Sequence, residues 1–513
     1  MRPRNRFAFV LVLALAVRPA AAAEPPALDA KVIDAAVETA LKEFKAPGAA
    51  VVVVRDGKVV HLKGYGLRRL GGDRPVTADT VFPIASCSKP FTSALIAQLV
   101  DEKKLKWDDR VSDHLDLFRL SDPLADREVT FRDLLSHRTG MPRHDMLWVA
   151  HAGATPDLIR RWCRAKSSTS FRSTWEYANV PFTTAGYVAG TLNGSDWAAA
   201  VKTRLFDPLE MKSTSATAKA GQAAADHATP HYRAFDGSVK PVVWDDIDHA
   251  GGAGCVNSTA RDMGNWLRAQ LAGGEFNDKQ VIPKAALRET HSPQMLVKAE
   301  GPFAAFFPAK ASAFVSYGLG WFVHDYRGHT CVSHGGTLTG FRAQCMMMPE
   351  KKLGVVVLCN LRPSAVAEVV ARTVLDRALG LPEEDWVAFH KGTFALAELT
   401  VINARSKRDK ERKADTKPAL APEKYAGRYE DKAYGTAAVT EADGKLTLRW
   451  GRMVFRLDHY HYDTFTAVPL EPKDEVVSYD RSILDVRFRL GSNGEVEGLT
   501  FLDQDFRREA GKK

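Results

Sequence analysis

Strand-like segments stand at both ends of a long, mostly helical stretch, and this order restricts the folds open to the chain. Near the start, residues 49–54 and 59–62 flank the turn pair Asp56-Gly57, a pattern typical of a β-hairpin. Residues 83–287 follow a mostly helical pattern. Strand-like runs then return at residues 317–323, 330–333, 341–348 and 353–359. We therefore expect an α/β (α+β) fold, in which one antiparallel sheet is assembled from distant segments, flanked by helices, and interrupted by an inserted helical region.

A second, smaller unit is expected at the C-terminal end. Residues 405–417 hold seven basic and three acidic residues and no large apolar ones, so they cannot form a core. From Lys424 onward the chain reads as short strands, with turn pairs at Asp443-Gly444 and Asn493-Gly494. We predict a first domain over residues 24–392, a helical and charged linker over 393–422 and an all-β domain over 423–513. We also expect residues 24–400 to fold and keep their chemistry without the rest.

The first 23 residues have the pattern of a secretory signal. Arg2, Arg4 and Arg6 precede an apolar run at residues 7–17, and small residues follow at 20–23. The run is too short for a bilayer-spanning helix, although an uncleaved anchor is the alternative. We predict cleavage near residues 21–23 and export to the periplasm or the medium. No later segment is apolar enough to span a membrane, so we expect no integral membrane partner.

Charge and cysteine spacing argue against nucleic-acid binding and metal binding. The net charge of +9 falls to +5 without the four Arg of residues 1–23, and this excess is too small to indicate nucleic-acid binding. The six cysteines show no metal-binding spacing and are expected to be mostly small buried residues. Cys331 and Cys345 could pair across neighbouring strands. The spacing of His324, His329 and His334 suits no helix-face metal site, and we expect no metal and no cofactor.

The chemistry-bearing motif is Ser86-Cys87-Ser88-Lys89, which precedes an apolar helical run. Three residues apart on a helix, Lys89 lies on the same face as Ser86 and within reach of its hydroxyl. A serine hydroxyl becomes a nucleophile when a neighbouring base takes its proton. Alone, this motif is more often a helix cap followed by a surface lysine. Pro90 lacks the N–H that a regular helix would use, so we expect an irregular first turn.

Two further motifs could complete a site. In Tyr177-Ala178-Asn179 the outer side chains point the same way if the backbone is extended. A tyrosine beside a lysine can have a lowered pKa and act as a general base. His334-Gly335-Gly336 ends a strand-like run, where the absence of glycine side chains would let a substrate lie close and the Thr337 N–H reach its carbonyl. Alone, a packed tyrosine and a glycine-rich turn are the simpler interpretations.

Together, in this order and at these separations, the three motifs resemble the class C β-lactamase and penicillin-binding serine hydrolase family. Residues 30–380 carry this resemblance. From Lys424 on, residues 425–429 and Tyr434-Gly435 resemble a lipocalin-like β domain often attached to such hydrolases. Further matching segments are residues 131–137, 139–140, 251–258, 262–263 and 317–321.

The resemblance implies a β-lactamase/transpeptidase-like fold and a role for each motif residue. Ser86 would be the nucleophile, Lys89 its activator, and Tyr177 the base for acylation and the acid toward the leaving group. Asn179 would orient Lys89 and substrate. The N–H groups of Ser86 and Thr337 would form the oxyanion hole.

The sequence departs from the β-lactamase pattern at His334, where a lysine is usual. A mostly neutral histidine suits esterases, D-aminopeptidases and D,D-peptidases better than a carboxylate-bearing antibiotic. We predict an exported hydrolase that cleaves an ester or amide of a small molecule or peptide through an acyl-enzyme. A β-lactamase, or a penicillin-binding protein that does not turn over, is the alternative. Arg342 is either a carboxylate anchor or a surface salt-bridge residue. The oligomeric state is left open.

Overall fold

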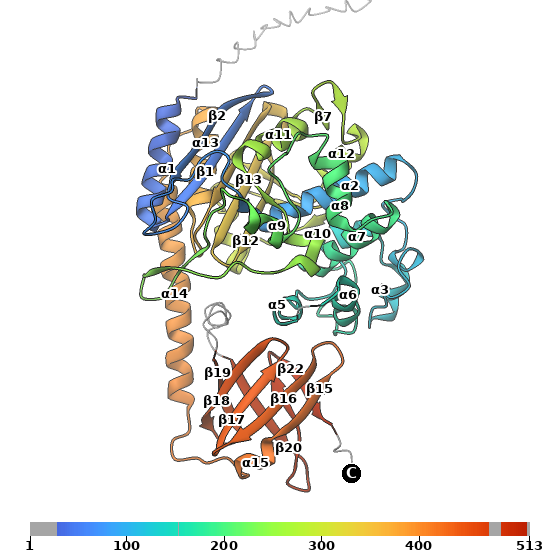
Figure 1. Cartoon of the computed structure of the whole chain (residues 1–513), viewed down its shortest axis with the longest axis vertical. Helices are drawn as coiled ribbons and strands as arrows, with labels where there is room; N and C mark the ends of the chain where they lie inside the picture. Colours follow the sequence, from blue (N-terminus) through green and yellow to red (C-terminus); the bar gives the residue numbers. More distant parts are fainter. Residues whose placement is uncertain (1–27, 152, 471–483, 510–513) are drawn as a thin grey trace, which may run out of the picture.

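The computed structural model describes residues 28–151, 153–470 and 484–509 (Figure 1). The predicted secretory signal, residues 1–23, lies outside the described residues. Within the described part, none of the helices combines the length and the apolar character needed to cross a membrane.

An eight-stranded antiparallel sheet forms the centre of the first domain, in the order β2-β1-β14-β13-β12-β11-β10-β9. β1 pairs with β14, from Ala49 opposite Cys359 to Arg55 opposite Leu353. Strands from the start of the chain thus lie beside strands that follow the helical region, and the predicted sheet of distant segments is confirmed. The strands are β1 (Gly48–Arg55), β2 (Lys58–Gly66), β9 (Met295–Leu296), β10 (Val315–Tyr317), β11 (Phe322–Tyr326), β12 (His329–Leu338), β13 (Phe341–Met348) and β14 (Leu353–Cys359).

Two strand boundaries differ from the sequence-based expectation. The run at 317–323 is not one strand, because a turn with Gly320 at φ 84° separates β10 from β11. The run at 330–333 extends to Leu338, so His334-Gly335-Gly336 lies inside β12 rather than at its end. Sheet pairing with β13 continues through these glycines and overrides their weak intrinsic preference for strands.

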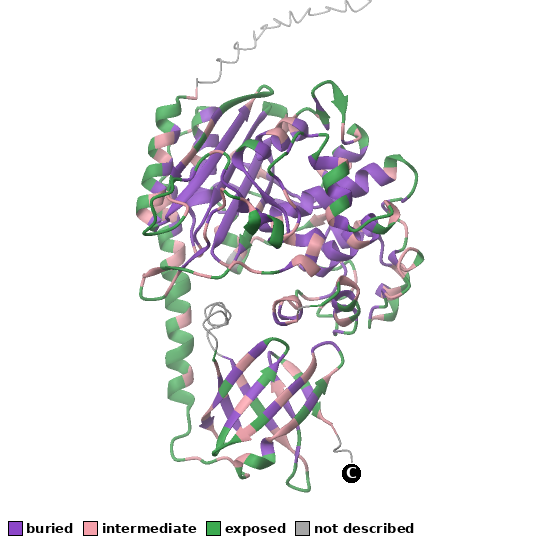
Figure 2. Ribbon diagram, in the orientation of Figure 1, coloured by how far each residue is buried: buried purple, intermediate pink, exposed green. Residues whose placement is uncertain are grey.

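Helices cover both faces of the sheet. α1 (Ala30–Phe44) begins after its N-cap Asp29, buries Ile33, Val37, Ala40 and Phe44, and packs beside α13 (Val366–Leu379) on one face. The inserted helical region covers the other face, and Figure 2 shows the buried residues concentrated between these layers. Its helices are α2 (Lys89–Asp101), α3 (Pro123–Glu128), α4 (Phe131–Leu135), α5 (Met146–Ala150), α6 (Thr155–Cys163), α7 (Val180–Leu192), α8 (Trp197–Val201), α9 (Ala218–Ala223), α10 (Gly251–Gly254), α11 (Ala260–Leu271) and α12 (Lys284–Thr290).

Short elements connect these helices and shape the loops. The small strand pairs are β3 (Phe82–Pro83) with β6 (Asn257–Ser258), β4 (His231–Arg233) with β5 (Val239–Pro241), and β7 (Glu275–Phe276) with β8 (Lys279–Gln280). The 3₁₀ turns are η1 (Ala85–Ser88), η2 (Val111–Asp113), η4 (Asp248–Ala250), η5 (Gly301–Ala305) and η6 (Pro349–Lys351), and η3 (Lys202–Phe206) is a π-helical turn.

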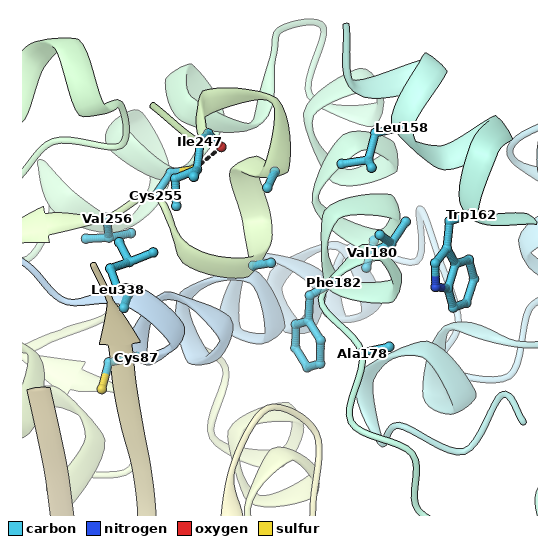
Figure 3. Packing of buried hydrophobic residues seen from close by; sticks show 14 of the residues in the cluster. Cys87, Leu158, Trp162, Ala178, Val180, Phe182, Ile247, Cys255, Val256 and Leu338 are labelled. Atoms are coloured by element: carbon cyan, nitrogen blue, oxygen red, sulfur yellow. Dashed lines mark hydrogen bonds between the residues drawn. The ribbon is translucent and has the colours of Figure 1, made fainter. Parts of the chain in front are cut away.

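The core between the sheet and the helical region holds the site in place. Figure 3 shows part of it, with Val180, Phe182 and Trp162 packed around α7 and Cys87 near the sheet. Each of these side chains is at most 3% exposed. Burying a large apolar side chain contributes roughly 1.5–3 kcal/mol. The elements that carry Ser86 and Tyr177 are therefore fixed by packing.

The C-terminal unit is a closed barrel of eight antiparallel strands, which confirms the predicted all-β domain. Its inward side chains, among them Tyr429, Trp450, Phe455 and Phe506, are fully buried and fill the interior. The short helix α15 (Pro422–Tyr425) precedes the strands β15 (Gly427–Asp431), β16 (Gly435–Ala442), β17 (Lys445–Trp450), β18 (Met453–His461), β19 (Thr464–Pro469), β20 (Asp485–Leu490), β21 (Val496–Phe501) and β22 (Gln504–Arg508).

The predicted linker is more ordered than its composition indicated. α14 (Trp386–Glu411) is a single helix that includes the first half of the charged tract. Arg408 lies 3.6 Å from the ring centroid of Tyr460 and forms an ion pair of 2.6 Å with Asp485. These contacts with the barrel stabilise the helix at its C-terminal end, and the sequence pattern did not reveal them.

Candidate active site

Ser86 lies in a strained, irregular turn at the entrance of α2. Ala85 before it has φ 50°, a left-handed conformation that is costly for a residue with a Cβ. The 3₁₀ turn η1 then passes into α2 at Lys89, whose backbone N–H donates to Ser86 O. The predicted irregular first turn is confirmed. Because its neighbours are buried and Ser86 itself is only half-buried, the hydroxyl is offered to a cavity.

Lys89 is fully buried, and its Nζ makes three polar contacts. Nζ lies 3.1 Å from Ser86 Oγ, 2.8 Å from Asn179 Oδ1 and 2.9 Å from Ala253 O. Burial lowers the pKa of Lys89 well below its usual range, and the charge of Arg143 lowers it further. A neutral amine has two N–H donors and one lone pair. The two carbonyl-type oxygens can only accept, so they take the N–H groups and leave the lone pair facing the Ser86 hydroxyl.

Tyr177 also reaches Ser86 but is not ionised. Its hydroxyl forms a hydrogen bond with Ser86, and its ring centroid lies 4.9 Å from Lys89 Nζ. Desolvation raises the pKa of Tyr177 to about 12, more than the nearby Arg143 charge lowers it. This direction is opposite to the lowered pKa expected from the sequence. The reason is that Tyr177 is itself buried, and desolvation disfavours the charged phenolate.

Asn179 links the Tyr177-Ala178-Asn179 motif to Lys89 of the Ser86 motif. It is the N-cap residue of α7, with Oδ1 toward Lys89 and Nδ2 donating to Asp145 Oδ1 at 2.9 Å. Asp145 in turn forms an ion pair with Arg143, whose guanidinium lies 5.0 Å from the Tyr177 ring centroid. Sequence reasoning missed Arg143 and Asp145, because no spacing rule connects their loop to either motif.

His137 and Tyr317 also surround the site without having been singled out as site residues. The Ala178 N–H donates to His137 Nδ1 at 3.2 Å, and the His137 ring lies 4.4 Å from the Tyr177 ring, centroid to centroid. Tyr317 Oη lies 3.0 Å from His334 Nε2. Both lie in segments that resemble the family, residues 131–137 and 317–321. That resemblance was the one feature of the sequence that could have pointed to them.

His334 is buried and neutral. Its Nδ1 lies 2.7 Å from Gly335 O, an oxygen that only accepts, so Nδ1 carries the proton and Nε2 accepts from Tyr317. Burial lowers the pKa of His334 to about 3. The expectation of a neutral histidine here holds well below pH 7.

The two glycines after His334 serve the fold as well as the site. A Cβ at Gly336 would lie 2.0 Å from Ile84 O, so only glycine lets β12 approach the turn that carries Ser86. β11 pairs with β12 only as far as Ser333 in the described residues, so its partnership stops before Gly335 and Thr337. Ser86, Gly335 and Thr337 all border the same cavity. The structure therefore brings the three sequence motifs together.

Of the two interpretations of Arg342 drawn from the sequence, the structure contradicts the surface salt bridge. Arg342 is 7% exposed and forms a buried ion pair with Glu368 of α13. Its Nη1 donates to Gly336 O at 3.1 Å and also contacts the Thr337 hydroxyl. Through these contacts Arg342 connects β12 to Glu368 of α13. It is therefore a buried residue and not a surface salt-bridge residue.

A cavity of about 140 Å³ opens beside Ser86. A cavity of roughly 150 Å³ accommodates a benzene ring. Its polar lining residues include Tyr177, His334, Thr337, Arg342, Glu368 and Arg372. Four phenylalanines form an apolar wall: Phe303, Phe306, Phe307 and Phe322.

The cysteines are free and buried, which is the state expected for most of them. Cys331 and Cys345 do not pair. β12 and β13 place His334 opposite Cys345, and the two cysteines pack into different cores on opposite faces of the sheet.

Comparison with known proteins identifies the family and the fold. Residues 33–379 match the Beta-lactamase family, and residues 411–513 match a domain of unknown function (DUF3471). The chain belongs to the Beta-lactamase family. The predicted serine hydrolase of the β-lactamase-related family is thereby confirmed at the level of the family.

Relatives extend this match over most of the chain. Unguisins hydrolase ungD from Aspergillus violaceofuscus is 30% identical over 441 residues, covering 80% of this chain and 76% of the relative. Penicillin-binding protein 4 from Amycolatopsis lactamdurans is 28% identical over 62% of this chain and 82% of its own. The octameric penicillin-binding protein homologue from Pyrococcus abyssi shares the fold, with a TM-score of 0.59, 20% identity, and coverage of 94% of this chain and 99% of its own.

Proposed function

We propose that the protein hydrolyses an ester or amide through an acyl-enzyme on Ser86. The observation that carries this proposal is the contact between the buried Lys89 amine and Ser86 Oγ, with both amine hydrogens directed at carbonyl-type oxygens. A neutral amine with its lone pair toward a hydroxyl is a general base ready to accept the proton.

The reaction follows from this arrangement. Ser86 Oγ attacks the substrate carbonyl carbon while its proton passes to Lys89 Nζ. The carbonyl π electrons move to oxygen, and the N–H groups of Ser86 and Thr337 stabilise that oxyanion. When the oxyanion collapses, the bond to the leaving oxygen or nitrogen breaks and the leaving atom takes a proton. Water then attacks the acyl-enzyme by the same route and restores the Ser86 hydroxyl.

Tyr177 takes the part of a proton donor in this proposal. Its phenol stays protonated because its pKa is about 12, and its hydroxyl already bonds to Ser86. It can give its proton to the leaving group and regain one from the Lys89 ammonium, so no free phenolate is needed. Asn179 holds Lys89 in register through its Oδ1.

The substrate we propose is neutral near His334 and carries one bulky apolar group. A histidine with a pKa of about 3 offers no charge to a substrate carboxylate at neutral pH. The four-phenylalanine wall of the adjoining cavity suits a side chain the size of a benzene ring or a leucine. Esterase and D-aminopeptidase types, whose substrates need no carboxylate at this position, are therefore favoured over β-lactamase activity.

A substrate panel on the purified protein tests the proposal. It includes p-nitrophenyl esters of increasing acyl size, D-amino-acid amides, D-Ala-D-Ala peptides and nitrocefin. Ser86→Ala should abolish turnover of every substrate that the wild type cleaves. Ser93→Ala should not, although it removes a buried hydroxyl from α2, the helix that follows Ser86.

The outcome decides between the alternatives. Retained activity in Ser86→Ala would refute the acyl-enzyme. Preference for nitrocefin, or a stable adduct on Ser86 without turnover, would favour a β-lactamase or a penicillin-binding protein that only acylates. We expect the best ester or amide to carry a branched or aromatic acyl group.

We also propose that the protein is exported and cleaved near residues 21–23. The support is the order of basic, apolar and small residues in the first 23 positions. N-terminal sequencing of the mature protein from a native host tests this. A mature chain that begins at residue 1 or 2 would refute it.

A further inference from the structure

One segment of the inserted region contacts both the candidate site and the C-terminal barrel. It runs from Met141 to His151 and includes α5, which lies between the helical region and the barrel in Figure 1. On the site side, Asp145 Oδ1 accepts from Asn179 Nδ2 at 2.9 Å, and Arg143 lies over the Tyr177 ring. The segment therefore supports two of the groups that surround Ser86.

Its first contact with the barrel lies between these two residues. His144 has φ 46°, a left-handed conformation that is unusual for a residue with a side chain. Its ring contacts the barrel, with Nδ1 2.9 Å from Tyr434 Oη and the two ring centroids 5.7 Å apart. Arg143 and Asp145 contact the site while the residue between them is bonded to the barrel.

The second contact fixes the other end of α5. Ala150 O accepts from the Arg452 backbone N–H at 2.8 Å, and the His151 and Trp450 rings lie 5.0 Å apart, centroid to centroid. Gly451 has φ 56°, and a Cβ there would lie 2.3 Å from Ala150 O. The barrel backbone thus approaches the segment as closely as glycine permits.

We propose that the barrel positions this segment, and that Tyr434 is a positioning residue for the catalytic centre, acting through His144 on Asp145, Arg143 and hence on Asn179 and Lys89. The inference rests on the proposed function, since it concerns the same site. It implies that residues 24–400, expected to fold and keep their chemistry alone, would react more slowly without the barrel, because two hydrogen bonds to the segment come from residues 434 and 452.

The arrangement predicts a change in pH dependence as well as in rate. Burial lowers the pKa of Lys89 most, and the Arg143 charge follows. If the segment moves away, Lys89 regains solvent and loses both the repulsion of Arg143 and the smaller attraction of Asp145, so its pKa rises. Because the neutral amine is the active form, the acid limb of the profile then moves to higher pH. The charged and titratable groups around Lys89 are Arg143, Asp145, Tyr177, His137, His334, Cys87 and Cys255.

Tyr434→Phe in the full-length protein is the first test. It removes the hydroxyl but keeps the ring that stacks on Trp450 at 5.5 Å. We expect kcat/KM to fall about 3- to 30-fold, mainly through kcat, with the acid limb shifted upward. Tyr462→Phe is the matched control, because Tyr462 is a 55% exposed tyrosine of the same barrel.

Gly451→Ala is the second, independent test. The new Cβ would push on Ala150 O, while the control Gly444→Ala introduces a side chain at φ 75° with no atom within 4 Å. Both variants carry left-handed backbone strain, but only the first displaces the segment. We expect the rate and the pH profile to change in Gly451→Ala alone.

Labelling of Ser86 by a fluorophosphonate, followed by mass spectrometry, gives a readout that needs no substrate. Slower labelling in Tyr434→Phe and Gly451→Ala than in their controls supports the proposal. Equal rates and equal pH profiles in all four variants would overturn it while leaving the function intact. Undiminished activity in Ser86→Ala would instead overturn the function itself.

Discussion

The two domains treat polar side chains in opposite ways. The hydrolase domain buries several charged groups to 4% exposure or less, among them Lys89, Asp133 and Glu368. In the described part of the barrel, Thr464 is the only buried polar residue apart from tyrosines, and the charged side chains lie outside. Both domains are built on antiparallel strands, so the difference does not come from the type of secondary structure.

Burying a charge costs several kcal/mol unless partners compensate for it. The barrel avoids that cost because its interior is filled with aromatic side chains. Its polar groups remain on the surface, where they can contact the hydrolase domain. The hydrolase domain accepts the cost for two different reasons. Lys89 forms its hydrogen bonds with a hydroxyl, an amide oxygen and a backbone carbonyl, as the proposed chemistry requires, whereas Glu368 is paired with Arg342 and serves structure.

Replacing the catalytic amine should give the largest effect. Lys89→Met keeps the length of the side chain but removes the base, so kcat/KM should fall at least ~100-fold. Asn179 Oδ1 and Ala253 O lose a donor, and the free energy of unfolding should fall by roughly 1–3 kcal/mol. Kinetics on the best substrate and denaturant unfolding measure the two. Lys445→Met, on the barrel surface, should change neither, and a Lys89→Met enzyme of normal rate would contradict the assignment.

Breaking the buried ion pair should lower the free energy of unfolding. Its effect on activity should be smaller than that of replacing Lys89. Glu368→Gln leaves the Arg342 charge without its partner, at a cost of roughly 3–5 kcal/mol in the free energy of unfolding. Burial alone would raise the pKa of Glu368, but the charge and hydrogen bond of Arg342, with a contribution from His390, together outweigh burial and the pKa is lowered. A lowered pKa stabilises the fold above the unfolded value of about 4.3, and this contribution is lost as pH falls.

Denaturant unfolding at pH 7 and pH 3.5 measures this prediction. The difference between wild type and Glu368→Gln should shrink at the lower pH. The control is Asp458→Asn, which breaks an exposed pair with Arg456 on the barrel and should have little effect at either pH. Equal losses in the two variants would remove the contrast between the domains.

The smallest expected effect concerns His334. Because its pKa is about 3, it is already neutral at pH 6 and has no proton to lose between pH 6 and 8. The profile of kcat/KM on a neutral ester should therefore show no fall in this range. A fall between pH 6 and 8 that disappears in His334→Asn would show that a protonated His334 contributes.

Much of the site was visible in the sequence because it depends on local spacing. Ser86 and Lys89 are three residues apart at the start of a helix, and Pro90 predicted the irregular turn that η1 forms. The Asp56-Gly57 hairpin and the strand runs on either side of the helical region indicated one sheet. These features follow from backbone preferences and apolar periodicity, which act over a few residues.

The sequence by itself therefore determined which motifs come together at the candidate site, the sheet of distant segments and the all-β second domain. Only the tertiary structure decided the protonation of Lys89 and Tyr177, because a pKa depends on how completely neighbours from many segments exclude water. It alone placed Arg143 and Asp145 behind Asn179. It also joined the barrel to that loop through His144 and Tyr434, since a contact across 290 residues leaves no local pattern in either segment.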